Sequence, residues 1–358
     1  MPCYDRFSRP LNGGNEKFTL QGVTWINDEH DGRRMKVLIT GGGGFLGSRL
    51  AQALLQKGSL ADGEGRQLPI SQIILFDMAF PDDVDTRLQC VTGDLNDKAL
   101  VEATLGGDTQ AVFHLASVVS GGAEADFDLG YKVNLDGTRG LLEACRKQAS
   151  PPRFVFTSSV AVFGGDLPEI LDDGTTPNPQ GSYGAQKVIC EYLVTDYSRK
   201  GYIDGRSLRL PTISVRPGKP NLAASSFASG IIREPLSGVS AICPVERDAM
   251  IWLLSPRKVI ASLIHAFDLP SSAWGVKRVV NLPGCTAVVG EMIDTLRRIA
   301  GDKVADLIEI KPEARIDQLV RSWPARFHNA RALQMGFSAD ADVESIIRAY
   351  IEDQGIKI

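Results

Sequence analysis

The sequence predicts an α/β protein: a doubly wound parallel sheet followed by a smaller C-terminal α/β lobe. Three observations lead to this prediction. A glycine-rich turn near residue 41 joins a short apolar run to an apolar-faced helix. Apolar runs then alternate with helical segments as far as residue 210, which is typical of parallel sheets with helices on both faces. After Pro211 the alternation stops, and prolines and small residues become frequent.

The same features suggest how the chain is divided. Residues 1–34 are polar, rich in Gly, Asn and Asp, and contain no signal-peptide core. Because Met35 directly precedes the first predicted strand, we expect residues 1–34 to be a disordered extension or to reflect an upstream choice of start codon, and not to be part of the fold. Residues 35–210 should form a cofactor-binding domain that is completed by residues 255–282. Residues 211–358 should mainly form a substrate-binding lobe.

Composition excludes several classes of function. The chain has 358 residues and a net charge of -4, with no basic cluster to attract nucleic acid or an anionic membrane. Six dispersed cysteines form no Cys-x-x-Cys pair, which is typical of the reduced thiols of a cytoplasmic protein. The four histidines lack the spacing of metal ligands, so no metal site is expected. No apolar run is long enough to span a membrane.

The first strand and helix carry the strongest cofactor signal. Residues 37–40 are apolar and β-branched, and residues 48–55 present an apolar helix face. Between them, Gly41 permits a tight turn, Gly44 lets the backbone approach a pyrophosphate, and Gly47 allows close packing of helix on strand. The helix N-terminus would face the phosphates. This pattern predicts a dinucleotide site.

The second strand, residues 72–76, follows a polar insertion at residues 58–66 and ends at Asp77. A carboxylate at this position normally accepts hydrogen bonds from the adenosine ribose. Met78 and Ala79 follow, so a 2′-phosphate would meet a like charge and no counter-charge. NAD is therefore favoured over NADP. The alternative is that Asp77 only caps a turn.

Further strands are predicted at residues 88–91, 111–115, 153–157 and 207–210, with helices at 131–146 and 183–199. Ligands of such sheets lie beyond the carboxyl ends of the strands, where Asp94, Ala116 and Ser159 fall. His114 precedes such an end, inside a buried strand, and is interpreted as a core histidine.

Fewer elements can be predicted in the C-terminal part. Ser255 and Pro256 form an N-cap and first-turn pair for a helix that ends by Pro270. A returning strand is expected at residues 278–282. Helices follow at residues 286–300, ended by Gly301, and at residues 343–351.

Tyr183 and Lys187 suggest the chemistry. Their spacing of four residues places both side chains on one helix face. An ammonium beside a phenol favours the phenolate and should lower the tyrosine pKa from about 10. Such a tyrosine can remove a proton from an alcohol while a hydride leaves the same carbon. Ser159, at a strand end, could hold the reacting oxygen.

Together these motifs resemble the extended short-chain dehydrogenase/reductases, also called the NAD-dependent epimerase/dehydratase family. The resemblance covers Met35 to the C-terminus. It is carried by Thr40–Gly47 as Thr-Gly-x-x-Gly-x-x-Gly, by Gly93-Asp94-Leu95, by His114-Leu115-Ala116, by Asn134 to Thr138, by Ser158-Ser159-x-x-Val-Phe-Gly, and by Tyr183 to Lys187. It implies a Rossmann-type fold, NAD as cofactor and a Ser-Tyr-Lys site.

The resemblance also implies individual roles. The catalytic group would be Ser159, Tyr183 and Lys187, supported by Asn134. Lys187 would also bind the nicotinamide ribose. The remaining cofactor contacts would come from Gly41, Gly44, Phe45, Leu46, Gly47, Asp77, Asp94, Leu95, Ala116, Ser117, Tyr183, Pro211 and Thr212. A homodimer through the helices after the fourth and fifth strands is usual in the family.

Within the family, several segments are most similar to the D-erythronate dehydrogenase subgroup. They are residues 217–238, Trp252 to Arg257, and Ser322-Trp323-Pro324. The similarity implies NAD-dependent oxidation of a short sugar acid at its 2-hydroxyl. Val160 and Ala161 replace the Asp-Glu pair of dehydratases. Around Ala249 to Arg257 the aromatic residue and aspartate of epimerases are not in place.

Three hypotheses therefore remain: a sugar-acid dehydrogenase, a nucleoside-diphosphate-sugar 4-epimerase with tightly bound NAD, and an NAD-binding regulator without turnover. For a sugar acid, we expect Arg233 to bind the carboxylate, since an arginine fork orients carboxylates well. The alternative is that Arg233 pairs with Glu234 or Asp248. The substrate residues would be Ser120, Ser159, Tyr183, Asn221, Ser226 and Arg233.

Overall fold

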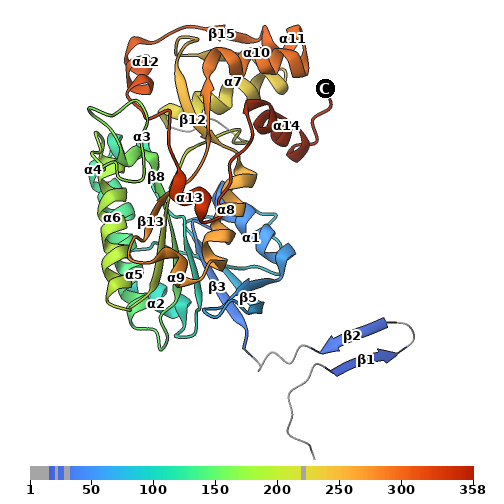
Figure 1. Cartoon of the computed structure of the whole chain (residues 1–358), viewed down its shortest axis with the longest axis vertical. Helices are drawn as coiled ribbons and strands as arrows, with labels where there is room; N and C mark the ends of the chain where they lie inside the picture. Colours follow the sequence, from blue (N-terminus) through green and yellow to red (C-terminus); the bar gives the residue numbers. More distant parts are fainter. Residues whose placement is uncertain (1–15, 21–22, 28–32, 219–222) are drawn as a thin grey trace, which may run out of the picture. The chain divides into compact units, whose positions relative to one another are not determined.

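The computed structural model describes residues 16–20, 23–27, 33–218 and 223–358, and the chain divides into two units, Met1–Arg34 and Met35–Ile358 (Figure 1). In the first unit, β1 (Glu16–Leu20) and β2 (Val23–Asn27) pair antiparallel. Most of the predicted extension lies outside the described residues, so its disorder remains a prediction. So do the boundaries proposed within the second unit.

The second unit contains an eight-stranded sheet in the order β13-β9-β8-β7-β3-β5-β4, with β6 paired to β5. All neighbouring pairs except β4–β5 are parallel. The strands are β3 (Met35–Thr40), β4 (Ser59–Ala61), β5 (Gln67–Asp77), β6 (Gln89–Thr92), β7 (Ala111–His114), β8 (Arg153–Ser159), β9 (Asp204–Leu210) and β13 (Val279–Asn281). After β3 the chain builds first one side of the sheet and then the other. This reversal creates the switch point at which ligands of such sheets bind.

Helices cover both faces, so the predicted doubly wound α/β fold is confirmed (Figure 1). Successive residues of β3 point to opposite layers, as the pleat of a strand requires. Val37 and Ile39 pack with α1 (Phe45–Lys57) and α8 (Pro256–Asp268). Leu38 packs with α2 (Lys98–Leu105), α5 (Thr138–Arg146) and α6 (Ser182–Arg199).

The structure differs from the sequence-based prediction in three places. The polar insertion contributes β4, which pairs with the first half of β5 as a hairpin. The helix predicted at residues 131–146 begins as a π-helix, Tyr131–Gly137, before α5. The helix predicted from residue 286 begins at α10 (Val289–Ala300), because β14 (Cys285–Val288) first pairs with β12 (Met250–Leu254).

A second lobe is built around the later strands of the chain. β10 (Thr212–Ile213), β12 and β14 form a three-stranded sheet, and β11 (Ala241–Cys243) pairs with β15 (Ile308–Ile310). Its core packs the sheet against α7 (Phe227–Leu236), α10 and α14 (Val343–Asp353). Short helices complete the unit: α3 (Ser120–Ala125), α4 (Phe127–Gly130), Val160–Val162, Ala224–Ser226, α9 (Ser271–Trp274), α11 (Asp302–Ala305), α12 (Ala314–Arg321) and α13 (Ala330–Gln334).

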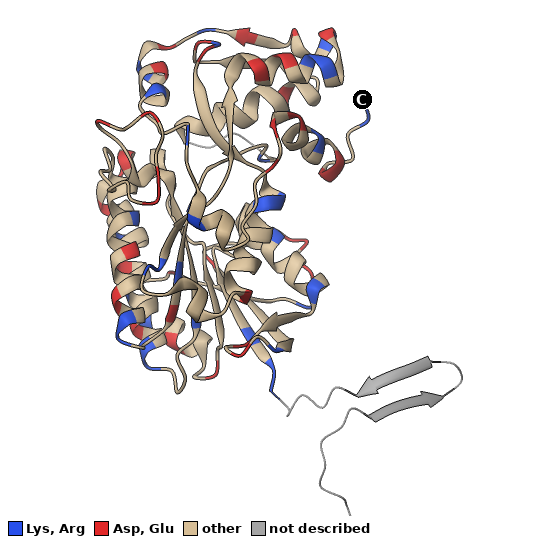
Figure 2. Ribbon diagram, in the orientation of Figure 1, with Lys and Arg blue, Asp and Glu red and all other residues tan. Residues whose placement is uncertain are grey.

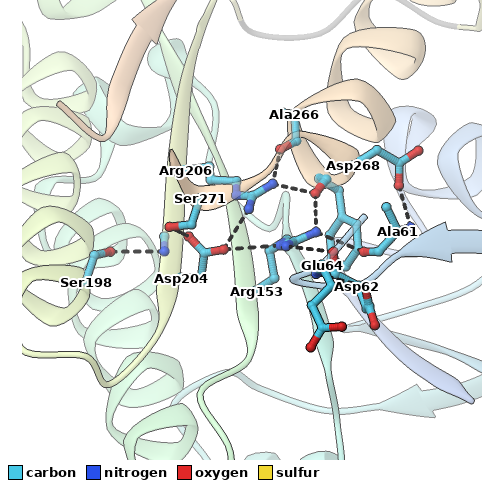
Figure 3. Close-up of polar contacts among 12 residues, drawn as sticks. Ala61, Asp62, Glu64, Arg153, Ser198, Asp204, Arg206, Ala266, Asp268 and Ser271 are labelled. Atoms are coloured by element: carbon cyan, nitrogen blue, oxygen red, sulfur yellow. Dashed lines mark hydrogen bonds and ion pairs between the residues drawn. The ribbon is translucent and has the colours of Figure 1, made fainter. Parts of the chain in front are cut away.

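A cluster of charges joins α8 to the sheet at the amino ends of β8 and β9 (Figure 3). Asp204 pairs with Arg153, Arg206 and Arg278. The guanidinium of Arg153 also donates to the carbonyl of Phe267 at 2.6 Å, near the C-terminus of α8. Arg206 donates to the same carbonyl. Since a helix C-terminus carries partial negative charge, it offsets the excess of buried cations.

The surface mixes both signs of charge. Figure 2 shows basic and acidic residues interspersed along α6 and around the second lobe. Among the described residues, no helix is both long and apolar enough to cross a membrane. Within the same residues, no group of His, Cys, Asp and Glu is arranged to hold a metal ion.

Candidate active site

Two adjoining cavities lie at the carboxyl ends of the parallel strands. The larger, about 760 Å³, follows the glycine turn and the ends of β5, β6 and β7. The smaller, about 260 Å³, lies between the end of β8 and the second lobe. The residues that line both are Val119, Ser158, Tyr183, Leu210, Ile213 and Arg216. These residues mark the boundary at which a ligand of one cavity would meet a ligand of the other.

The glycine turn has the geometry that a dinucleotide needs. Gly41 has a φ of +72°, and a Cβ there would lie 2.7 Å from the nitrogen of Ala116. A Cβ on Gly47 would lie 2.1 Å from the carbonyl oxygen of Gly41. Gly44 is the N-cap of α1 and, because glycine has no side chain, no side chain caps the first backbone N–H groups of the helix. The exposed amides at the start of α1 therefore remain available to phosphate oxygens.

Two carboxylates line the larger cavity. Asp77 accepts hydrogen bonds from the backbone nitrogens of Gly43 at 3.0 Å and Met78 at 2.7 Å, which fixes its orientation. Asp94 accepts from Asn96 and pairs with Lys132 at 3.3 Å. The backbone N–H of Asn96 is the main cause of a lowered pKa for Asp94. Asp94 is therefore anionic at neutral pH.

Most of the predicted cofactor residues line the larger cavity. They are Gly41, Gly44, Phe45, Leu46, Gly47, Asp77, Asp94, Leu95, Ala116, Ser117, Tyr183 and Lys187. Pro211 and Thr212 instead line the smaller cavity. The space, the glycine cradle and the Asp77 carboxylate together fit a nicotinamide dinucleotide.

Near the start of α6, Lys187 is buried and Tyr183 is half-buried. The Lys187 ammonium donates to the carbonyl of Thr157 at 2.8 Å and lies 5.4 Å from the centroid of the Tyr183 ring. Burial lowers the pKa of Lys187 to about 8, against the opposing influence of Cys190 and Glu191. Thr157, two residues before Ser159 on β8, therefore sets the direction of the lysine side chain.

The tyrosine pKa moves in the direction opposite to our prediction. Burial raises the pKa of Tyr183 to about 12, and a hydrogen bond with Ser117 offsets only part of this rise. Removing water from a phenolate costs more than the ammonium of Lys187 returns, because that ammonium is directed at the Thr157 carbonyl. In the protein alone, Tyr183 is therefore a proton donor at neutral pH.

Ser159 ends β8 and lines the smaller cavity. Its hydroxyl oxygen accepts from the backbone nitrogen of Ala161 at 3.1 Å. Because the hydroxyl oxygen is the acceptor in this bond, the O–H can still donate to a substrate. The neighbouring Ser158 hydroxyl instead donates to Glu191 at 2.5 Å. Ser159 is thus the better placed of the two to bind a reacting oxygen.

Asn134 supports the site without lining either cavity. Its side-chain oxygen accepts from Ser117 and from the Val118 nitrogen, at 3.0 and 2.7 Å. Its side-chain nitrogen donates to the Val118 carbonyl and to Gln186, at 3.0 and 2.7 Å. Asn134 therefore ties the loop after β7 to α6, from the π-helical turn that precedes α5.

A buried ion pair behind the serines was not predicted. Arg209 donates two hydrogen bonds to Glu191, at 2.9 and 2.7 Å, and its guanidinium lies 4.9 Å from the Phe163 ring centroid. Glu191 is one helical turn after Lys187, on the same face of α6. The pair joins the end of β9 to α6, and Glu191 also accepts from Ser158 near the end of β8.

The predicted substrate residues fall into three groups. Ser120, Ser159, Tyr183 and Ser226 line the smaller cavity. Asn221 lies outside the described residues. Arg233 lines neither cavity, because its buried guanidinium pairs with Glu234 at 2.5 Å and donates to the carbonyl of Arg216 at 2.7 Å. The structure therefore places Arg233 in the first of the two alternative pairings and does not bring it to the substrate cavity.

Sequence reasoning missed several lining residues. Arg216, between β10 and α7, reaches the boundary of both cavities. Trp252 of β12 and Trp323 after α12 close the smaller cavity from the second lobe. Trp252 and Trp323 lie in segments that carry the subgroup resemblance, but nothing local in the sequence assigned them to the site, because strands and helices far apart in sequence bring them together.

His114 is fully buried, as predicted for a core histidine. It makes hydrogen bonds to the hydroxyls of Thr40 at 2.6 Å and Thr138 at 2.8 Å. Burial lowers its pKa to about 3, so the ring is neutral.

Comparison with known proteins agrees with this geometry. Residues 37–269 match the model of the NAD dependent epimerase/dehydratase family. A D-erythronate dehydrogenase of Cupriavidus necator is 55% identical over 323 residues, which is 90% of this chain and 99% of that protein. A D-erythronate dehydrogenase of Haemophilus influenzae is 44% identical over 320 residues, covering 89% and 99%.

A solved structure is also similar over most of the chain. The nucleoside-diphosphate-sugar epimerase from Agrobacterium tumefaciens superimposes with a TM-score of 0.84 at 41% identity, covering 90% of this chain and 96% of that one. Its fold extends through both lobes described above.

Proposed function

The chain belongs to the NAD-dependent epimerase/dehydratase family, and from this we propose that it oxidises the 2-hydroxyl of a short sugar acid such as D-erythronate to the 2-keto acid. The observation that carries the proposal is the small cavity against Tyr183. Hydroxyl-bearing side chains line much of it: Ser120, Ser158, Ser159, Thr212, Ser225, Ser226 and Ser229. Such a lining suits a compact polyhydroxylated substrate.

We derive the reaction from the side chains at the boundary. Ser159 donates its hydroxyl proton to the oxygen of the substrate alcohol and holds it toward Tyr183. Tyr183, as a phenolate, takes the alcohol proton. A nicotinamide cofactor held in the larger cavity would supply the acceptor for the hydride from the same carbon. Lys187 holds positive charge next to the phenol, which favours the phenolate form against the effect of burial. Asn134 holds the loop at Ser117, which makes a hydrogen bond with the phenol.

The volume of the smaller cavity disfavours an epimerase. Pockets for drug-sized ligands span roughly 300–1,000 Å³, whereas this cavity measures about 260 Å³. A nucleoside diphosphate attached to a sugar would need more room than this. The epimerase remains the alternative proposal, since the Agrobacterium structure carries that name.

NAD is proposed over NADP because of Asp77. Its carboxylate is fixed by two backbone amides and lines the larger cavity, while the side chain of the next residue, Met78, is exposed. A ribose 2′-hydroxyl could donate to this carboxylate, but a 2′-phosphate would be repelled by it.

A homodimer is proposed through α4 and α6, which contact each other. These helices expose large apolar side chains: Phe127 is 58% exposed, Leu129 43% and Tyr192 68%. A patch of this kind favours burial against a second copy of the chain.

The function is tested by following NADH absorbance with purified protein and NAD. D-erythronate and other four-carbon aldonates are compared with UDP-sugars in the same assay. We expect NADH from an aldonate and none from a nucleotide sugar. Interconversion of a nucleotide sugar without net NADH, together with no turnover of any aldonate, would replace the dehydrogenase proposal by the epimerase.

A further inference from the structure

Arg216 is the charged residue of the smaller cavity. Among the described residues that line this cavity, every other one is apolar, aromatic or hydroxyl-bearing. Arg216 also lines the larger cavity, so it lies on the boundary that Tyr183 shares. Its side chain is half-buried.

The backbone of Arg216 is held to α7 by hydrogen bonds at both its nitrogen and its carbonyl oxygen. The hydroxyl oxygen of Ser229 accepts from its nitrogen at 3.0 Å. Arg233 donates to its carbonyl oxygen at 2.7 Å. Just before it, Ser214 donates to the Ala228 carbonyl of the same helix at 3.0 Å. These contacts fix where the side chain of Arg216 starts, while leaving the guanidinium itself uncommitted.

The guanidinium has no counter-charge within the described residues. Among these residues, no carboxylate forms an ion pair with the Arg216 guanidinium and no group accepts a hydrogen bond from it. The neighbouring Arg233, in contrast, is neutralised by Glu234. Burial, followed by repulsion from Arg233, lowers the pKa of Arg216. Both effects oppose an unpaired charge, and an incoming anion would relieve both.

We propose that Arg216 binds the substrate carboxylate and thereby selects the 2-hydroxyl for oxidation. This inference rests on the proposed dehydrogenase function. In a 2-hydroxy acid the carboxylate is bonded to the reacting carbon, and that carbon must lie at the boundary between cofactor and substrate. The cation that binds this carboxylate must therefore lie at the boundary too. Arg216 does, whereas a cation at the far end of the cavity would select a hydroxyl remote from the carboxylate.

The arginine fork then fixes orientation as well as charge. Two parallel N–H donors hold the carboxylate plane, which limits rotation of the adjoining carbon. With that rotation fixed, one hydroxyl can face Ser159 and Tyr183 while the remaining hydroxyls face the serines of the second lobe. Arg233 becomes a positioning residue, because it acts through the backbone of Arg216.

The test compares an acid with its neutral analogue. Wild type, Arg216→Gln and Arg216→Lys are assayed at saturating NAD with D-erythronate and with D-erythronamide, which keeps the carbon chain but lacks the charge. Arg297→Gln is the matched control, since Arg297 pairs on the surface with Asp302 and Asp306 and lines neither cavity. NAD affinity is measured separately by calorimetry.

We expect Arg216→Gln to lower kcat/KM for the acid by about 10- to 100-fold, as for a lost hydrogen bond to a charged group. Its kcat/KM for the amide should change little, so the preference for the acid collapses. Arg216→Lys should recover part of that preference, and Arg297→Gln should resemble wild type. NAD affinity should be the same in all four proteins.

Two results would overturn the assignment of Arg216. One is an equal loss for acid and amide, which would indicate a general structural defect. The other is weaker NAD binding with an unchanged acid preference, which would assign the guanidinium to the cofactor. If wild-type protein reduces no NAD with any four-carbon aldonate, the proposed function itself fails, and that outcome does not depend on Arg216.

Discussion

Tyr183 and Lys187 are two ionisable groups whose burial favours the neutral form of each. The pKa of the phenol rises to about 12, and the pKa of the ammonium falls to about 8. The sequence spacing showed that the two share a helix face. It could not show that Lys187 would be directed at the Thr157 carbonyl, since this depends on the packing of α6 against β8.

Removing the phenol should separate chemistry from binding. Tyr183→Phe should cut turnover by about 100-fold or more, as is typical for a lost acid or base group. The NAD dissociation constant should stay near that of wild type, because the ring and its contacts remain. Turnover is measured by NADH formation and affinity by calorimetry. Retention of more than half the activity would remove Tyr183 from the mechanism.

The pKa of Tyr183 also predicts a pH dependence that differs between oxidation and reduction. Oxidation needs the phenolate, and below a raised pKa the ionised fraction increases about tenfold with each pH unit. Oxidation should therefore accelerate from pH 6 toward pH 8, roughly where loss of the Lys187 charge begins to oppose it. Reduction of the keto acid needs the phenol, which predominates throughout, so it should change little. Parallel pH profiles in the two directions would contradict this assignment.

Asp77 should set the choice of cofactor. Asp77→Ala should weaken NAD binding, and adding Met78→Arg should shift preference toward NADP, because a repelling carboxylate is replaced by a cation for the 2′-phosphate. The ratio of kcat/KM for the two cofactors measures the effect. Wild-type protein that already prefers NADP would show that Asp77 has a different role.

At the scale of elements, helix starts that depend on a few neighbouring residues could be predicted, whereas strands that depend on pairing with distant residues could not. The helix α8 begins where Ser255 and Pro256 predicted, and Ser255 caps the nitrogen of Lys258. Residues 286–288 were expected to be helical but form part of β14, because they pair with β12. Ser229 and Arg233, which make hydrogen bonds to the backbone of Arg216, belong to α7, and the sequence analysis did not predict this helix.

The charge cluster at α8 should contribute to the stability of the fold, and Asp204 is its central carboxylate. Asp204→Asn should leave three arginines without their carboxylate, and breaking a buried ion pair costs roughly 3–5 kcal/mol. Because the Asp204 side chain is 22% exposed, the lower end of this range is expected. The free energy of unfolding is measured by urea denaturation. Asp302→Asn, at an exposed pair, is the control and should change stability by less than about 1 kcal/mol.

At the scale of the whole molecule, the exposed apolar patch on α4 and α6 predicts association. Tyr192→Glu should place a charge in the centre of a symmetric contact and shift the protein to monomers. Light scattering after size-exclusion chromatography measures the mass. Val276→Glu is the control, because Val276 is 91% exposed and belongs to neither helix. A wild-type protein that is monomeric at micromolar concentration would exclude this interface.

The two cavities also belong to this scale. The sequence indicated that the glycine turn, Asp77, Ser159, Tyr183 and Lys187 would lie at the ends of the strands, where they line the cavities, because each lies inside a motif of the sequence. The smaller cavity could not be predicted, since it is built from β8, β12, α7 and the segment after α12. Trp252 and Trp323 meet there only after the second lobe has folded onto the first.

The return of the chain to the sheet has a consequence for synthesis. The helix α8 and the strand β13 belong to the cofactor-binding layers, yet they follow much of the second lobe in sequence. While the ribosome has released only residues up to Leu210, the sheet face that α8 later covers has no partner, and β9 is an unpaired edge. A nascent chain at this stage exposes apolar surface and a strand edge, both of which promote aggregation. The cofactor half therefore cannot mature ahead of the lobe that follows it, and chaperone demand should be greatest until residue 281 has emerged.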